Sequence, residues 1–278
     1  MVIDDTNKWY VNPDIYDRFA QAEDPLGLSL RFALEQVPPG AKTVVELGAG
    51  TGRFTFTALE QRPEIETLVA VDASNEMFSY LGRQLNLRPR LLDRLRLVHT
   101  RNESLPVDDQ SVDAVISSWA FPSNMWDEQT CLAEMSEVHR VLKPGGVLIT
   151  VGWDENFRDQ LSDLWYRFVP EPDYRRESME EWRRRRRDRI RSPRNCGLTF
   201  IKRNLRVPLL FETPGEAAEV LGHLFGVSAA TWVGQQQRCE FSVAVGITVD
   251  DRSSVAAALK TLRQQSRLAS ADGEQIHE

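Results

Sequence analysis

Three glycines within five positions are the first residues of this chain whose spacing could serve a ligand. They lie in the segment VVELGAGTGRF, residues 44–54, behind a short apolar run that carries Glu46. A glycine-rich turn after a strand usually holds a phosphate, because its backbone amides face the ligand. Here the order is G-x-G-x-G, and Arg53 stands where the dinucleotide fingerprint has its third glycine. The turn alone fits a plain strand-to-helix connection as well as a nucleotide site.

Acidic residues at two strand ends favour a ligand with hydroxyl or cationic groups. Glu46 lies at the end of the first predicted strand, where an anionic ligand would be repelled. Asp72 ends the second, and an acid in that position can accept hydrogen bonds from both hydroxyls of a ribose. The segment NESLP, residues 102–106, follows the third strand as a loop that could bracket an adenine. We expect these residues to gather in one crevice at the carboxyl edge of a parallel sheet.

The elements that must position these residues alternate over residues 42–153. Strands are predicted at 42–48, 66–74, 95–100, 112–119 and 146–153, and helices at 52–61, 74–86 and 127–143. Ser74 stands as the N-cap of the second helix, and Lys143 and Pro144 with two glycines end the third. Strands separated by helices predict right-handed crossovers and a parallel, doubly wound α/β sheet.

A different pattern begins after Trp153. Helices are predicted at 155–169, 175–191 and 214–226, strands within 198–213 and 239–249, and a frayed tail from residue 266. Pro214 stands near the start of the third of these helices and Gly226 at its end, where these residues favour helix boundaries.

Four motifs, taken together, carry a resemblance to a known family. The segments VVELGAGTGRF, VAVDASNEMF, NESLPVDDQSVDAVISSWAF and MSEVHRVLKPGGVLITV resemble, in order and spacing, the class I S-adenosylmethionine-dependent methyltransferases. The similarity is greatest to their small-molecule group, which includes the ubiquinone and menaquinone methyltransferases, and covers about residues 42–153.

The resemblance implies a fold and a division of the chain. The fold is a Rossmann-like doubly wound sheet of about seven strands, mostly parallel, with an N-terminal helical lid and a C-terminal helical insertion. The expected parts are a helical lid (1–40), a cofactor-binding core (41–153), a substrate-side insertion that completes the sheet (154–250), and a C-terminal helix with a frayed tail (251–278).

The resemblance also implies how S-adenosylmethionine (SAM) is held, with S-adenosylhomocysteine as the product. The glycines would let the backbone approach the methionine part, Asp72 would hold the ribose, and Glu46 would orient the turn and the amino end of the ligand. The implied cofactor residues are Glu46, Gly48, Ala49, Gly50, Gly52, Asp72, Ala73, Met77, Asn102, Glu103 and Ser118.

The adenine is expected between two short segments. Ala73 and Met77 would supply apolar contact, and Asn102 and Glu103 would lie on the other edge of the ring. The family commonly has an acid where this chain has Arg101, and this departure weakens the assignment of the adenine edge.

No catalytic residue is assigned, because methyl transfer by in-line displacement depends mainly on positioning. A hydroxyl or ammonium acceptor would in addition need a base. The candidates for a base are Asp154, His223, Tyr16, Glu155, His139 and His99, of which His139 and His99 favour structural roles by their places in a helix and at a strand end. Tyr16, Trp119 and Trp153 are the candidate substrate residues, with core packing as the alternative.

The run RRRRR, Arg183 to Arg187, has three interpretations. It is typical of a solvated helix face, it could recognise a carboxylate or phosphate on the substrate, or it could approach RNA. The net charge of −7 gives no overall electrostatic reason to bind nucleic acid or an anionic membrane.

The composition is that of an ordinary globular protein. The start of the chain lacks the pattern of a signal peptide, and the three cysteines have no CxxC spacing, so we expect a cytoplasmic protein with no metal site. The leading prediction is a SAM-dependent methyltransferase that acts at O, N or C of a small, and in one interpretation anionic, metabolite. The alternatives are a SAM-binding regulator or cyclase-type scaffold without methyl transfer, or an RNA or protein methyltransferase. The sequence leaves the oligomeric state undecided, with a homodimer as one alternative.

Overall fold

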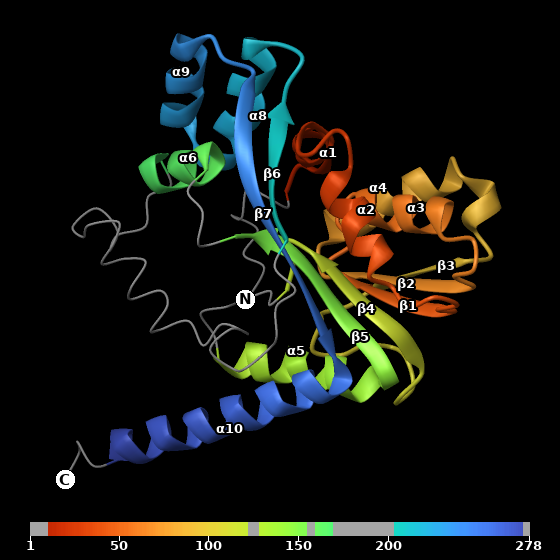
Figure 1. The fold of residues 1–278 in the computed structure, drawn as a ribbon. Helices are drawn as coiled ribbons and strands as arrows, with labels where there is room; N and C mark the ends of the chain where they lie inside the picture. The colour runs from red at the N-terminus through yellow and green to blue at the C-terminus, as the bar shows by residue number, and fades with distance from the viewer. Residues whose placement is uncertain (1–10, 122–127, 155–158, 169–202, 275–278) are drawn as a thin grey trace.

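The computed structural model describes residues 11–121, 128–154, 159–168 and 203–274, and its centre is one seven-stranded sheet (Figure 1). The strands are β1 (Thr43–Leu47), β2 (Thr67–Asp72), β3 (Leu95–His99), β4 (Val112–Ser118), β5 (Leu142–Trp153), β6 (Arg203–Leu210) and β7 (Glu240–Asp251). Their order is β3-β2-β1-β4-β5-β7-β6. The first five pair in parallel, and β7 runs antiparallel to both of its neighbours. The predicted Rossmann-like, mostly parallel sheet is confirmed.

The helices are α1 (Pro13–Ala22), α2 (Leu28–Glu35), α3 (Arg53–Gln61), α4 (Asn75–Asn86), α5 (Glu128–Val141), α6 (Gln160–Phe168), α8 (Pro214–Phe225), α9 (Val227–Gln236) and α10 (Arg252–Glu274), with a short 3₁₀ turn at Pro89–Leu91. The predicted boundaries hold where the capping residue is local. The Ser74 hydroxyl accepts a hydrogen bond from the Met77 amide at 3.2 Å. Pro214 begins α8, and Gly226 follows its last residue.

Alternate residues of the central strands pack into two separate layers. In β1, Val44 packs with α2 and α3, whereas Val45 packs with α5 and α10. Figure 1 shows α5 and α10 side by side below β4 and β5. Because both faces of the parallel strands are covered, their sequences are continuous apolar runs.

Four local expectations need correction. Helix α5 ends at Val141, before the predicted end, because Leu142 already pairs with Val112 of β4. Helix α9 was not predicted. Helix α6 begins at Gln160, whereas the predicted helix began at residue 155. The tail is not frayed from residue 266, because α10 continues to Glu274. The predicted helix 175–191, with Arg183 to Arg187, lies outside the described residues, as does Glu155.

The chain between α1 and α2 joins the far edge of the sheet. Glu23 forms an isolated antiparallel bridge with Leu209 of β6, and the Asp24 amide donates to the Pro208 carbonyl at 2.9 Å. The Asp24 carboxylate accepts from the amides of Leu28 and Ser29, which begin α2. The two N-terminal helices are thereby tied to β6, and Figure 1 shows α1 beside that strand.

Within the part of the chain that the structure describes, no helix is long and apolar enough to cross a membrane. The same residues contain no group of three or more histidine, cysteine or acidic side chains that could hold a metal ion.

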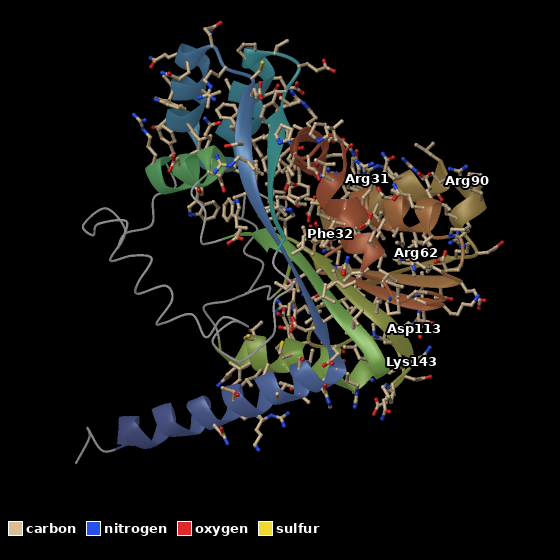
Figure 2. All side chains as sticks on the ribbon, viewed as in Figure 1. Arg31, Phe32, Arg62, Arg90, Asp113 and Lys143 are labelled. Carbon is tan, nitrogen blue, oxygen red and sulfur yellow. The ribbon has the colours of Figure 1, made fainter. Side chains whose placement is uncertain are left out.

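At the opposite, amino edge of the sheet, Asp113 and Lys143 form an ion pair (Figure 2). Asp113 accepts hydrogen bonds from the amides of Lys42 and Thr43, at 2.8 and 2.9 Å, and from the Lys143 ammonium at 2.7 Å. Its carboxylate thus joins β1, β4 and the start of β5 on the side away from the glycine turn.

Arg62 closes the loop that leads from α2 into β1. Its guanidinium donates to the carbonyl of Leu34 and to those of Val37 and Pro38, both at 3.2 Å. The side chain is 16% exposed, so its loss removes three hydrogen bonds from a partly buried loop, in which the Leu34 and Pro38 carbonyls keep only the Val37 and Ala41 amides as donors.

We predict that Arg62→Ala lowers the free energy of unfolding by about 1–3 kcal/mol, measured by urea denaturation. Arg90→Ala is the matched control, because Arg90 is 73% exposed and its one ion pair, to Glu60, lies at the surface (Figure 2). Equal effects of the two substitutions would contradict the assigned role of Arg62.

Candidate functional site

The glycine turn between β1 and α3 has a backbone that only glycine adopts easily. Gly48, Gly50 and Gly52 have φ angles of 65°, 56° and 91°. A Cβ on Gly48 would lie 2.2 Å from the Cβ of Ala120, and one on Gly52 would lie 2.3 Å from Leu81 Cδ1. The turn is therefore packed directly against the chain that leaves β4, and Gly48 is the point of close approach.

Asp72 connects the end of β2 to this turn. Its carboxylate accepts from the Gly50 amide at 2.7 Å and from the Ser74 amide at 2.8 Å. Burial raises the pKa of Asp72, and these amides together with the nearby His99 lower it. A carboxylate can accept about four hydrogen bonds, so the group retains acceptor capacity for a ligand. Since the Gly50 amide is already directed at a carboxylate, the turn is a poor phosphate cradle.

Glu46 lies inside the protein and not at the mouth of the turn. The residue is 1% exposed, and its carboxyl accepts a hydrogen bond from the Thr55 hydroxyl of α3 at 2.5 Å. Burial raises the pKa of Glu46 to about 8, the Thr55 hydrogen bond lowers it, and the nearby Asp72 raises it. In this arrangement Glu46 couples β1 to α3, which supports the turn from behind.

The predicted adenine residues lie on both sides of the β2 and β3 ends. Met77 of α4 is fully buried. The Asn102 amide donates to the Ala120 carbonyl at 3.3 Å and to the Glu134 carboxylate of α5 at 3.2 Å, so its two N–H groups are directed into the protein. Glu103 is half-buried. The groups that could contact an adenine are therefore the backbone of this loop and the side-chain carbonyl oxygen of Asn102.

Ala49, Ala73 and Ser118 lie at or just after the ends of β1, β2 and β4. The Ala49 amide donates to the Val71 carbonyl at 2.9 Å, which joins the turn to β2. The Ala73 carbonyl lies 3.1 Å from His99 Nε2, and this contact gives the histidine a structural role. Ser118 is the last residue of β4 and is half-buried.

The N-terminal helices contact the turn through Tyr16. Its Cε1 atom lies 3.5 Å from the position that a Cβ on Gly50 would occupy. The Tyr16 ring also packs against Phe19 of the same helix, with ring centroids 6.4 Å apart. Helix α1 therefore covers the glycine turn, in the place expected of a lid.

Aromatic side chains form a continuous row beyond the ends of β4 and β5. Trp119 and Trp153 meet edge to face with ring centroids 5.7 Å apart, and Trp153 and Trp165 of α6 do the same at 5.7 Å. Trp165 continues the row to Phe225 of α8 at 6.2 Å. Trp119 has a φ of 65°, a rare backbone state for a bulky residue that is concentrated at functional sites.

The remaining base candidates lie apart from one another. Asp154 follows β5 and is buried beside Gly246, whose added Cβ would lie 3.4 Å from the Asp154 Cβ. His223 is in the last turn of α8. His139 lies on α5 toward α10, where burial and the charges of Arg252 and Arg263 lower its pKa, in keeping with its structural interpretation.

Sequence reasoning missed one acidic residue at the crevice, Glu23. The residue is 4% exposed, and its Oε2 lies 3.4 Å from Nη1 of Arg53, the residue that follows Gly52. Burial raises the pKa of Glu23 to about 7, Arg53 lowers it, Asp24 raises it, and the nearby Trp119 side chain lowers it. The one available signal was Arg53 itself, because a buried arginine requires an acid or a carbonyl nearby.

The raised pKa of Glu46 predicts a pH-dependent stability. Its folded-state value of about 8 lies above the ordinary value of 4.5 that the carboxyl regains on unfolding. Between these values the folded protein holds a proton that the unfolded chain releases, so the free energy of unfolding falls as pH rises. One such group contributes up to about 1.4 kcal/mol per pH unit.

Glu46→Gln should remove this component, because the amide is neutral at every pH and still accepts the Thr55 hydrogen bond. The measurement is urea denaturation of both proteins at several pH values between about 5 and about 8. The exposed Glu60→Gln serves as control. A difference between wild type and Glu46→Gln that does not change with pH would show that Glu46 is ionised in the fold.

Comparison with known proteins agrees with this geometry. Residues 44–146 match the family described as "Methyltransferase domain". Over 150 residues the chain is 34% identical to the malonyl-[acyl-carrier protein] O-methyltransferase of Methylococcus capsulatus, which covers 54% of this chain and 51% of that protein. Over 137 residues it is 30% identical to the ubiquinone/menaquinone biosynthesis C-methyltransferase UbiE of Geobacter sp., which covers 49% and 56%. The chain thus spans about half the length of these relatives.

A solved structure extends the likeness of the fold beyond the matched segment. The YcgJ protein of Bacillus subtilis superimposes with a TM-score of 0.52 and 18% identity, over 80% of this chain and 97% of that one. At this identity the likeness concerns the fold alone. The segment from Val44 to Gly146 therefore resembles a methyltransferase domain, and it lies on a Rossmann-like sheet.

Proposed function

We propose that the chain is a SAM-dependent methyltransferase that acts on a small metabolite. The observation that carries this proposal is the contact between Asp72 and the Gly50 amide at the carboxyl edge of β1 and β2. It directs a carboxylate at the place where a ligand would meet the glycine turn. A ligand with ribose hydroxyls and a cationic amino end suits that carboxylate, whereas a pyrophosphate does not.

The residues around the turn fit SAM by the same chemistry. Gly48 and Gly50 are half-buried and carry no side chain that would keep a ligand from the backbone, and Asp72 retains acceptor capacity for ribose hydroxyls. The other predicted cofactor residues, which include Glu46, would support the turn and border the adenine. When bound, SAM supplies an electrophilic methyl group on a sulfonium.

The side chains around the crevice would position the acceptor and exclude water. Tyr16 covers Gly50 from the lid, and Trp119 and Trp153 form an apolar wall at the ends of β4 and β5. A wall of indole faces also favours a cationic group through the ring quadrupole. These residues can act by alignment alone, and alignment supplies much of the rate in a displacement reaction.

The identity of the acceptor is a separate question. One of the two named relatives is called an O-methyltransferase and the other a C-methyltransferase, and each resembles only about half of this chain. We infer a small-molecule acceptor from these names, at O, N or C. A second prediction is that the acceptor carries an anionic group, which Arg183 to Arg187 would recognise. Replacing these arginines with glutamine should then raise the KM for the anionic acceptor. An unchanged KM would favour the interpretation of the run as a solvated helix face.

Two other functions are kept as alternatives. A SAM-binding protein without methyl transfer would share the cofactor site, and an RNA or protein methyltransferase would use the arginine run to approach its substrate. Incubation with methyl-labelled SAM and cell extracts separates them: we expect label in a low-molecular-weight product. Label in RNA or protein, or no labelled product across many extracts, would contradict the proposal.

We predict that Asp72→Ala weakens SAM binding roughly 10- to 100-fold, because the ribose hydroxyls lose a charged acceptor. Isothermal titration calorimetry measures the effect. Asp113→Ala is the matched control, since Asp113 also accepts two backbone amides but lies at the amino edge of the sheet. Unchanged affinity in Asp72→Ala, or an equal loss in both variants, would overturn the assignment.

A further inference from the structure

One buried carboxyl oxygen near the glycine turn, Oε1 of Glu23, forms none of the contacts that hold the described fold together. Glu23 Oε1 is buried and has no hydrogen-bond partner among the residues that the structure describes. The other oxygen, Oε2, has only a long contact of 3.4 Å to Arg53. A buried acceptor without a donor is unfavourable, so its presence calls for a ligand or a proton.

The neighbouring acid shows what a purely structural carboxylate does in the same loop. Both oxygens of Asp24 are used, by the Leu28 amide at 3.0 Å and by the amide and hydroxyl of Ser29, each at 2.6 Å. Arg53, for its part, donates at 2.8 Å to the Asp24 carbonyl. The fold of the loop is therefore secured by Asp24, and Arg53 has a better partner than Glu23.

Glu23 lies between two side chains near the glycine turn. On one side is Arg53, the first residue of α3 after the glycine turn. On the other is Trp119, whose side chain is close enough to lower the pKa of the Glu23 carboxyl and whose ring packs on Trp153. The bridge to Leu209 of β6 fixes the backbone of Glu23 at this place.

We propose that Glu23 selects a methyl acceptor whose reacting end is a hydrogen-bond donor, an O–H or N–H group, on an apolar body that lies against Trp119 and Trp153. This inference rests on the proposed function. The donor would satisfy Oε1, and the indole faces would cover the apolar body. While Glu23 is ionised, a carboxylate at the same place is repelled and is disfavoured as the reacting group.

Binding of small probes to the full chain tests this without any turnover. The probes are 2-phenylethanol, 2-phenylethylamine, the methyl ether of 2-phenylethanol, and phenylacetate, with tryptophan fluorescence and calorimetry as readouts. The alcohol and its ether differ by a single donor, and the amine separates an N–H from an O–H source. We expect wild type to bind the alcohol or the amine roughly 10-fold more tightly than the ether, and phenylacetate least.

Two substitutions separate the charge of Glu23 from its acceptor oxygen. Glu23→Met removes both and should abolish the preference for the alcohol over the ether. Glu23→Gln keeps an acceptor and should retain that preference while phenylacetate binds more tightly. Glu219→Gln is the control. Glu219 of α8 forms a surface ion pair with Arg18 of α1, so its substitution should change neither the preference for the alcohol over the ether nor the rejection of phenylacetate.

Several results would overturn the inference. They are equal binding of alcohol and ether by wild type, absence of binding by both donor probes at millimolar concentration, and a preference that survives in Glu23→Met. If Glu23→Met does not fold, unchanged rejection of phenylacetate by Glu23→Gln has the same force. Calorimetry with SAM on the same protein separates the two proposals: SAM binding without donor selectivity sinks only this inference, whereas selectivity without SAM binding sinks only the proposed function.

Discussion

The hydrogen bond between the Gly50 amide and the Asp72 carboxylate is the contact on which the candidate site depends. It joins the turn after β1 to the end of β2, and it exists because parallel strands bring their carboxyl ends to one edge. The left-handed backbone at Gly48, Gly50 and Gly52 allows the turn to reach that carboxylate. Every other group of the site is arranged around this contact: Tyr16 above the turn, Glu46 behind it, and Trp119 beside it.

Features that depend on neighbouring residues could be predicted from the sequence. The strands of the core are short apolar runs because both faces of the sheet are covered, and Ser74 caps α4 through a bond to a residue three positions away. The glycine turn and Asp72 could be placed together because sheet topology, once inferred from the alternation of elements, brings strand ends together. The end of α5 was misplaced because pairing with β4 begins at Leu142, a tertiary contact that overrides the local stop signal.

Features that depend on contacts between distant parts of the chain could not be predicted from the sequence. The order β5-β7-β6 follows from pairing between segments far apart in the chain, and no local pattern specifies it. Glu46 was expected to face a ligand, and only the packing of α3 shows Thr55 as its partner. Glu23 lies in an ordinary polar loop whose sequence carries no functional spacing; its burial results from the meeting of α1, β6 and the turn.

The bridge between Glu23 and Leu209 has a second consequence, which concerns assembly. Strand β6 is an edge of the sheet, and an exposed edge can recruit a strand from another molecule. The loop from α1 occupies part of that edge, and Pro208 within β6 has no amide hydrogen to offer. The segment that adjoins the candidate site therefore also protects the rim of the sheet, so displacing it would expose an edge strand that is prone to aggregation.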